Sequence, residues 1–178
     1  MNKKLFVVFA LAVCTAATAD PRTITPTFDA KVIRVSDGDT VTVLNSRNEQ
    51  IKVRLANIDA PEGSHGRCRP GQPFSAQSKK YLSDLVKGKT VRFQCSTLDR
   101  YGRSICDIEI DGTTANRMLV GAGLAWANRS NPTFLRDPGV AEAEKQAVIK
   151  RAGLWSDLRA IPRWEWRKTV WGSAPGCK

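Results

Sequence analysis

Five charged side chains stand at turns and strand ends where folding alone does not require them: Asp39, Arg54, Asp59, Glu62 and Arg103. The carboxylates of Asp39 and Asp59 are hard oxygen ligands that suit Ca²⁺ or Mg²⁺. The guanidinium groups of Arg54 and Arg103 can each bind two phosphate oxygens. A further carboxylate, Glu62, can orient or deprotonate water. Together they indicate phosphodiester hydrolysis, because cations stabilise its dianionic transition state more than the monoanionic substrate.

Each of these residues also has a structural explanation when it is taken alone. Acids on either side of a glycine, such as Asp37 and Asp39 around Gly38, are common in plain turns. Asp59 is suited to a turn before a proline, and a strand residue such as Arg54 is usually solvated. The order of acids does not match a calcium-binding EF-hand loop. The combination is therefore more specific than any of its members.

The elements that must position these residues follow from hydrophobic alternation. Val and Ile alternate with polar residues, or form β-branched runs, in the segments 28–35, 40–44, 50–56, 90–95 and 103–110. Helical signals cover a segment from Pro73 to about Val86, and then 114–123 and 140–152. Five short strands with a helix between the third and the fourth predict an OB-type barrel, a mainly β fold of the α+β class.

The segment from Asp59 to Gln72 is a long loop that contains the only histidine, His65. Loops of this length are usually functional or mobile. A Ser-His-Asp hydrolase is nearly excluded, since His65 would have to be its base.

The N-terminus reads as a secretory signal over residues 1–19. Lys3 and Lys4 precede a short apolar stretch, and Ala17-Thr18-Ala19 is an A-x-A cleavage site. A membrane anchor is disfavoured because no apolar run reaches the ~20 residues of a spanning helix. We therefore expect a secreted or periplasmic protein with no membrane span, cleaved after Ala19, and a flexible lead-in over residues 20–27.

Four cysteines follow the signal segment: Cys68, Cys95, Cys106 and Cys177. In an exported chain they predict at least one disulfide, with three possible connectivities. A zinc site is the alternative, although the chain has no C-x-x-C pair. Buried free thiols at Cys95 and Cys106 are a third reading.

The chain is basic, with 28 Lys and Arg against 17 Asp and Glu and a net charge of +11. Such a balance favours polyanions, and binding should then weaken steeply with salt. Exported proteins that are attracted to anionic membranes or wall polymers have the same basic composition.

Three spaced motifs make the chain similar to the thermonuclease (staphylococcal or micrococcal nuclease-like) family, as an exported bacterial member. They are Asp37-Gly38-Asp39-Thr40, Arg54-Leu55-Ala56-Asn57-Ile58-Asp59-Ala60-Pro61-Glu62 and Asp99-Arg100-Tyr101-Gly102-Arg103. The resemblance covers residues 28–155 as one domain. It implies an OB-type barrel and calcium-dependent hydrolysis of DNA and RNA that leaves 3′-phosphates.

The resemblance also implies roles for individual residues. The carboxylates of Asp39 and Asp59 and the backbone carbonyl of Ala60 would bind Ca²⁺. The catalytic residues would be Arg54, Glu62 and Arg103. The side chains of Arg100 and Tyr101 would contact a neighbouring phosphate of the substrate. We expect the enzyme to be a monomer.

Two features depart from the family pattern. Trp126 stands near positions where the type protein has tyrosines, so it is either a stacking platform for a base or a core residue. The Trp- and Arg-rich extension 156–178 includes Arg163-Trp164-Glu165-Trp166-Arg167. This extension either braces the domain or extends the nucleic-acid surface. It is expected to be packed on the domain or mobile.

Two other functions compete with the nuclease. A non-catalytic OB-fold module that binds nucleic acid or a protein would use the acids only as turn residues. However, carboxylates beside a phosphate path repel it unless a cation is bound. A cationic surface-binding protein would depend on the C-terminal extension and would lose its activity when that extension is deleted.

Overall fold

The computed structural model describes residues 27–172. The expected signal segment 1–19, nearly all of the lead-in and Cys177 lie outside the described residues. None of the helices in the described part is long and apolar enough to cross a membrane.

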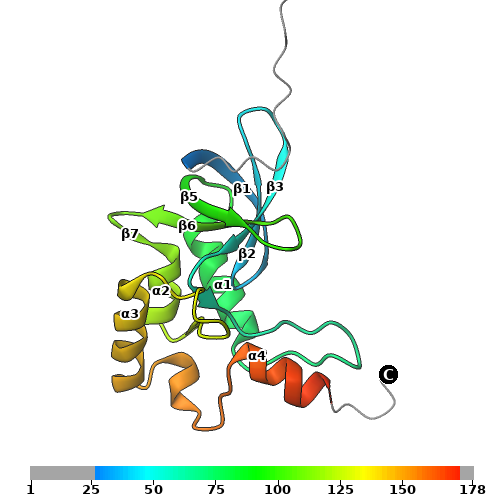
Figure 1. Ribbon diagram of the computed structural model, residues 1–178, viewed down its shortest axis with the longest axis vertical. Helices are drawn as coiled ribbons and strands as arrows, with labels where there is room; N and C mark the ends of the chain where they lie inside the picture. Colours follow the sequence, from blue (N-terminus) through cyan, green and yellow to red (C-terminus); the bar gives the residue numbers. More distant parts are fainter. Residues whose placement is uncertain (1–26, 173–178) are drawn as a thin grey trace, which may run out of the picture.

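The strands form the barrel that the alternation predicts (Figure 1). Five strands build its wall: β1 (Thr27–Asp37), β2 (Thr40–Leu44), β3 (Gln50–Leu55), β5 (Thr90–Leu98) and β6 (Ser104–Ile110). They pair antiparallel in the order β3-β2-β1-β5-β6, and a parallel pairing of β3 with β6 closes the barrel. The short strand β7 (Thr113–Thr114) pairs antiparallel with the end of β6. The fold is therefore the expected OB-type α+β barrel.

Helices close the end of the barrel that carries the charged residues. Helix α1 (Ser75–Val86) connects the loop that follows β4, residues 60–74 and here called the site loop, to β5. Helix α2 (Ala115–Gly121) follows β7, and α3 (Pro138–Ile149) packs on α2. Helix α1 begins at Ser75 rather than at Pro73, because Phe74 adopts a left-handed backbone with φ of 66°.

The core consists of the apolar side chains that alternation places inside the barrel. Val32, Val41, Val53 and Phe93 come from four strands and are fully buried, and Leu82 of α1 covers them. Each such side chain contributes roughly 1.5–3 kcal/mol to folding when it leaves water. This core holds the strand ends in fixed positions, so the residues at the rim are held as well.

The cysteines of the barrel form a disulfide. Cys95 on β5 and Cys106 on β6 are direct partners in the ladder and are bonded to each other. The expectation of at least one disulfide is confirmed, and the zinc and free-thiol readings of this pair are wrong. Cys68 is disulfide-bonded too.

A second pair of strands joins the C-terminal half to the segment after β3, and a glycine contact holds the turn after α2 against the turn after α3. Strand β4 (Ile58–Asp59) pairs with β8 (Trp126–Ala127). Gly123 lies so close to the turn before the 3₁₀ helix η1 (Gly153–Ser156) that an added Cβ would be 2.1 Å from the carbonyl oxygen of Ala152. The backbone N–H of Leu154 donates to the carbonyl of Gly123 at 2.8 Å.

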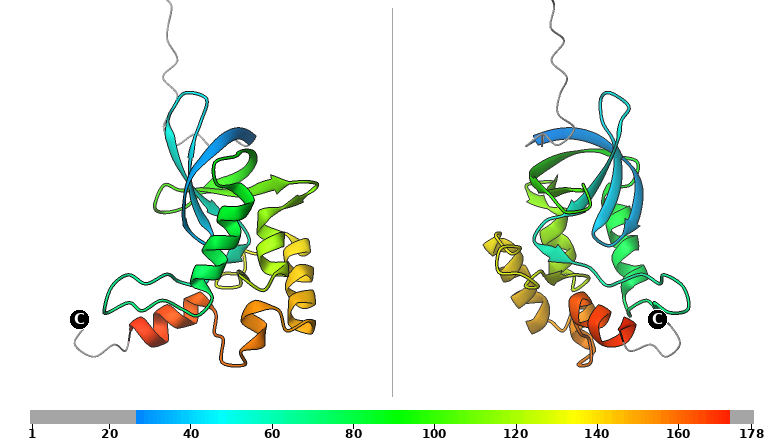
Figure 2. Two further views of the ribbon diagram at one scale, coloured as in Figure 1. Left: turned by 180° about the vertical axis from the view of Figure 1, so that it is seen from behind. Right: turned by 45° about the vertical axis from the view of Figure 1, so that its right-hand side comes forward.

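The described part of the chain ends in two short helical turns, α4 (Arg163–Trp166) and the π-helical η2 (Arg167–Trp171). We call these residues, 163–171, the C-terminal segment. In Figures 1 and 2 it lies alongside the loop between β4 and α1. The indole N–H groups of Trp166 and Trp171 both donate to the carbonyl of Pro70 in that loop, at 3.1 and 3.0 Å.

Asn116 is a buried polar link between α2 and the barrel, and its removal should destabilise the fold. Its amide donates to the carbonyls of Ala56 and Cys106 and accepts from the backbone N–H of Ile108. We expect Asn116→Ala to lower the free energy of unfolding by about 1–3 kcal/mol, since buried backbone groups lose their partner. Urea unfolding measures this, with Asn131→Ala in an exposed turn as the control. Equal losses in the two variants would contradict the assignment.

Candidate active site

Asp39 is held at the turn between β1 and β2, deep under the rim of the barrel. Its side chain is fully buried. The preceding Gly38 is required there, because an added Cβ would be 1.9 Å from Oγ of Ser78 and 2.8 Å from Cβ of Ala60. The close approach of this turn to α1 places the Asp39 carboxylate at the centre of the site.

Arg54 lies on β3 and joins two of the acids. Its Nη1 is 2.7 Å from Oδ2 of Asp39, and its Nη2 is 2.5 Å from Oδ1 of Asp59. Its side chain is only 10% exposed, so the solvated strand arginine considered above is wrong. Lys52, on the same face of β3, is exposed. Arg54 can be buried because the carboxylates of Asp39 and Asp59 replace the water that would otherwise solvate its guanidinium.

Asp59 and Ala60 reach the site through the short pairing of β4 with β8. Asp59 pairs with Trp126 in that ladder. The backbone N–H of Ala60 donates to Oδ2 of Asp39 at 2.8 Å. The residues from Asp59 to Glu62 therefore form the part of the rim that faces Asp39.

Glu62 is fixed at the start of the site loop and is 3% exposed. The backbone N–H of Glu62 donates to the side-chain oxygen of Gln72, and the backbone N–H of Gln72 donates to the carbonyl of Glu62, both at 2.8 Å. These two hydrogen bonds close the loop at its base. The carboxylate of Glu62 lies near those of Asp39 and Asp59, because a single guanidinium contacts all three acids.

That guanidinium belongs to Arg163, which the sequence alone does not assign to the site. Its Nη1 is 2.8 Å from Oδ2 of Asp39 and 3.2 Å from Oδ1 of Asp59, and its Nε is 2.6 Å from Oε2 of Glu62. Arg167, one turn later, places Nη2 2.5 Å from Oε1 of Glu62. The four-residue spacing of these arginines was the available signal, because such residues share one face of a helix.

The donor set suits a hard cation, but its arrangement leaves that cation little room. Two carboxylates and the nearby carbonyl of Ala60 are ligands of the calcium type. However, Oδ2 of Asp39 is already ion-paired with Arg54 and Arg163 and accepts a hydrogen bond from the backbone N–H of Ala60. Within residues 27–172, no group of three or more His, Cys, Asp and Glu side chains is arranged to hold a metal ion.

Burial and neighbouring charges control the protonation of Asp39. Burial raises the pKa of Asp39, but the guanidiniums of Arg54 and Arg163 lower it by more. The pKa therefore lies below its usual range. For Arg163, burial acts to lower the pKa, and the three carboxylates raise it above its ordinary value. Both groups are therefore charged at neutral pH.

Arg103 is ion-paired outside the acid cluster, beside Tyr101. Its ion pair is with Asp99, at 2.7 Å, and the ring of Tyr101 is 5.5 Å from its guanidinium. Arg100 also packs on Tyr101, at 4.8 Å, and hydrogen-bonds its hydroxyl. The structure thus brings together Asp39, Arg54, Asp59, Ala60 and Glu62, and holds Arg100, Tyr101 and Arg103 as a separate group.

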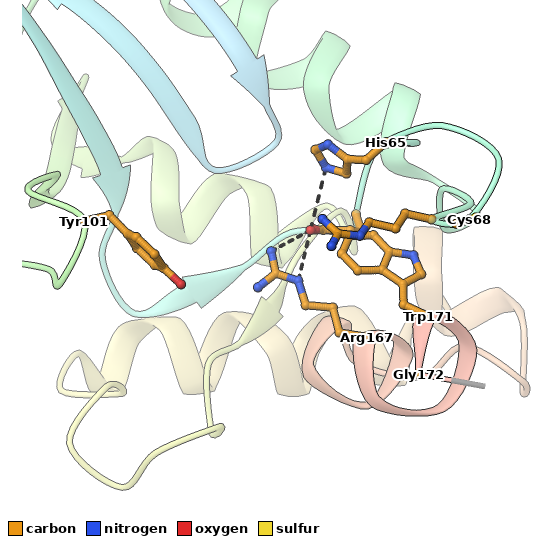
Figure 3. Close-up of a pocket in the computed structure, with 8 residues that line it drawn as sticks. His65, Cys68, Tyr101, Arg167, Trp171 and Gly172 are labelled. Carbon is orange, nitrogen blue, oxygen red and sulfur yellow. Dashed lines mark hydrogen bonds and ion pairs between the residues drawn. The ribbon is translucent and has the colours of Figure 1, made fainter. Parts of the chain in front are cut away.

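A pocket of about 540 Å³ separates the two groups. Figure 3 shows Tyr101 on one side and His65, Arg167 and Trp171 on the other. Glu62 and Arg69 also line it. The pocket is therefore bounded by aromatic and basic side chains and opens next to Glu62, a combination that suits an anionic ligand with flat rings.

Trp126 lies inside the protein, with 3% of its surface exposed, on β8. It borders a different cavity, of about 300 Å³, together with Phe74, Leu154 and Trp166. Of the two roles considered for it, this position is that of a core residue. Stacking on a base stays a prediction that would require this cavity to open.

The raised pKa of the Asp37 carboxyl predicts that the stability of the fold depends on pH. Burial and the adjacent charge of Asp39 raise its pKa to about 7, from an unfolded value of about 3.9. The folded protein therefore keeps a proton that the unfolded chain releases, and stability falls as pH rises from about 4 to about 7. We expect Asp37→Asn to be more stable than the wild type at pH 8 and equally stable at pH 4. Urea midpoints in a chelator measure this, and a gain that is the same at both pH values would contradict it.

The comparisons with known proteins agree with this geometry. Residues 52–157 match the family model described as "Staphylococcal nuclease homologue". The chain belongs to the staphylococcal nuclease homologue family. An "Uncharacterized endonuclease" of Haemophilus influenzae is 37% identical over 168 residues, 94% of this chain and 87% of that protein.

Two further relatives match most of this chain at a similar identity. A "Micrococcal nuclease" of Shigella flexneri is 38% identical over 152 residues, 79% of this chain and 81% of its own length. An "Uncharacterized endonuclease" of Escherichia coli O157:H7 is 38% identical over 138 residues, 77% of this chain and 83% of that protein. Membership of this family supports a phosphodiester hydrolase.

Proposed function

We propose that the chain is a calcium-dependent, sugar-nonspecific nuclease that hydrolyses DNA and RNA to 3′-phosphate products. The observation that carries this proposal is the buried cluster of Asp39, Asp59, Glu62 and Arg54 beside a basic, aromatic pocket. Nuclease names among the relatives agree with it. The net charge of +11 favours a polyanionic substrate.

The proposed mechanism assigns each residue a step. Glu62 removes a proton from water, the water oxygen bonds to phosphorus, and the bond to the 5′-oxygen breaks. The 5′-oxygen takes up a proton from solvent water and leaves as a hydroxyl group, Glu62 returns its proton to solvent, and the phosphate remains on the 3′ side. Arg54 and Arg103 donate hydrogen bonds to the phosphate oxygens as negative charge builds up. Arg100 and Tyr101 bind a neighbouring phosphate.

Calcium is the proposed cofactor. Asp39, Asp59 and the carbonyl of Ala60 would hold it, and when bound it supplies positive charge to the reacting phosphate. Arg163 must leave these carboxylates first, since its guanidinium contacts both of them.

The proposal is tested by cleavage of single-stranded DNA and of RNA in Ca²⁺, in Mg²⁺ and in a calcium chelator. We expect cleavage of both polymers in Ca²⁺ only, with product masses that shift after phosphatase treatment and that place the phosphate on the 3′ end. If no metal supports cleavage while salt-sensitive binding persists, the chain is instead a non-catalytic OB-fold module. Gel filtration tests the proposed monomer.

We also propose export, with cleavage after Ala19. The disulfide between Cys95 and Cys106 supports an oxidising compartment. Sequencing of the mature N-terminus from expressing cells should begin at Asp20. An uncleaved chain in the cytoplasm would contradict export.

A further inference from the structure

The C-terminal segment brings two guanidiniums to the acids that the proposed function needs free. Arg163 is ion-paired with Asp39, Asp59 and Glu62, and its side chain is 9% exposed. Burying a charged side chain so deeply is costly unless its partners compensate it fully. The segment is therefore placed specifically in the site, and it is more than a brace on the outside of the barrel.

Both oxygens of Glu62 are engaged by this segment. Oε2 is 2.6 Å from Nε of Arg163, while Oε1 accepts from Nη2 and Nε of Arg167 at 2.5 and 3.0 Å. Two cations beside the carboxylate compete with water for its lone pairs and lower its tendency to take up a proton. In this conformation Glu62 is a weaker base than a free carboxylate.

The charges show what the segment replaces. Asp39, Asp59 and Glu62 carry three negative charges when ionised, and Arg54 offsets one of them. The remaining two match the charge of a divalent cation. Arg163 and Arg167 also supply two positive charges. A divalent ion added while both arginines remain would leave a buried excess of positive charge.

Besides the ion pairs, hydrogen bonds and ring contacts hold the segment against the loop between β4 and α1, and the rings of Trp171 contact His65 and Arg69. Trp166 and Trp171 share one acceptor, the carbonyl of Pro70, and Gln72 donates to the carbonyl of Ile161 at 3.0 Å. Each such hydrogen bond contributes only about 0.5–1.5 kcal/mol. The two helical turns have four and five residues, too short to be stable in isolation. The ion pairs with the acids therefore add to the other contacts that keep the segment in place.

We propose that the C-terminal segment is an autoinhibitory strap whose Arg163 and Arg167 compete with a divalent cation for Asp39, Asp59 and Glu62. Calcium binding displaces the two arginines, which frees Glu62 and opens the site. This inference rests on the calcium requirement of the proposed function, and it concerns binding rather than turnover.

Calorimetric titration of the metal-free protein with Ca²⁺ tests the competition. We expect Arg163→Gln to bind Ca²⁺ at least about tenfold more tightly than the wild type, because the ion no longer displaces a cation. Arg167→Gln should tighten binding by less, since Arg167 is ion-paired with one of the three acids, Glu62, whereas Arg163 is paired with all of them. The matched control is Arg159→Gln, whose side chain is 90% exposed and paired with Asp157. Its affinity should equal that of the wild type.

A second measurement follows the segment itself. Trypsin should cleave the wild type after Arg167 or Lys168 faster in Ca²⁺ than in a chelator, with the sites identified by mass spectrometry. If Arg163→Gln is unfolded in the chelator because its acids repel, added Ca²⁺ should restore its folding. Arg167→Gln, at a half-exposed position, gives the affinity comparison in that case.

The outcomes separate this inference from the proposed function. Unchanged or weaker Ca²⁺ binding in both arginine variants would overturn the competition, even if the wild type cleaves DNA. Tighter binding without any cleavage would support the strap and contradict the nuclease. Tryptic cleavage that does not respond to Ca²⁺ would overturn displacement of the segment.

Discussion

Replacing Glu62 with Gln is expected to lower kcat on single-stranded DNA by about 10²–10⁴-fold, the usual contribution of a general base. The amide keeps the shape of the carboxylate but cannot accept the proton of the attacking water. Substrate affinity should change little, because the substrate phosphates are bound by arginines. Single-turnover cleavage at saturating Ca²⁺ measures the chemical step, and fluorescence anisotropy of a labelled oligonucleotide measures binding.

The matched control is Glu142→Gln, which changes the same functional group on the exposed side of α3. It should retain wild-type turnover. Because the Glu62→Gln variant also loses the ion pairs with Arg163 and Arg167, the measurement must be made at saturating Ca²⁺, where the segment is already displaced. Turnover of Glu62→Gln within a factor of about two of the wild type would remove Glu62 from the mechanism.

The second large effect is expected at Arg54. Arg54→Gln leaves the carboxylates of Asp39 and Asp59 without the cation that bridges them at 2.7 and 2.5 Å. Removing one partner of a buried ion pair typically costs about 3–5 kcal/mol, because the remaining charge stays buried. We expect a loss of this size in the free energy of unfolding, measured by urea denaturation in a chelator, together with loss of nuclease turnover.

Lys52→Gln is the control for Arg54, since Lys52 lies on the same face of β3 but is exposed. It should change the free energy of unfolding by less than about 0.5 kcal/mol, as exposed substitutions usually do. A loss of less than about 1 kcal/mol for Arg54→Gln, well below the usual cost of an unpaired buried charge, would mean that Arg163 alone neutralises the two acids. Normal turnover would remove Arg54 from the proposed mechanism.

The barrel could be predicted because it depends on local pattern. Alternation at Ile51, Val53 and Leu55 sets which side of β3 faces the core, and the turn at Gly38 sets where β2 begins. These signals act over a few residues, so they do not require knowledge of distant neighbours. The start of α1 is different, because the left-handed backbone of Phe74 is not favoured by its residue type.

The candidate site could be predicted only in part. The acids and Arg54 follow from their types and their order along strands that meet at one rim. The burial of Arg54 was not predictable from β3 alone, since its exposed neighbour Lys52 lies on the same face. It depends on the two carboxylates brought there by other elements.

The sequence by itself determined the barrel, the chemical types at its rim and the family, because hydrophobic alternation and motif spacing are properties of the chain order. Only the tertiary structure decided which charges meet. Arg163 is 124 residues from Asp39 along the chain, yet its Nη1 lies 2.8 Å from that carboxylate. No local pattern encodes such a contact, because it results from how α4 packs against the site loop. The strength of an ion pair depends on the distance and burial that this packing creates.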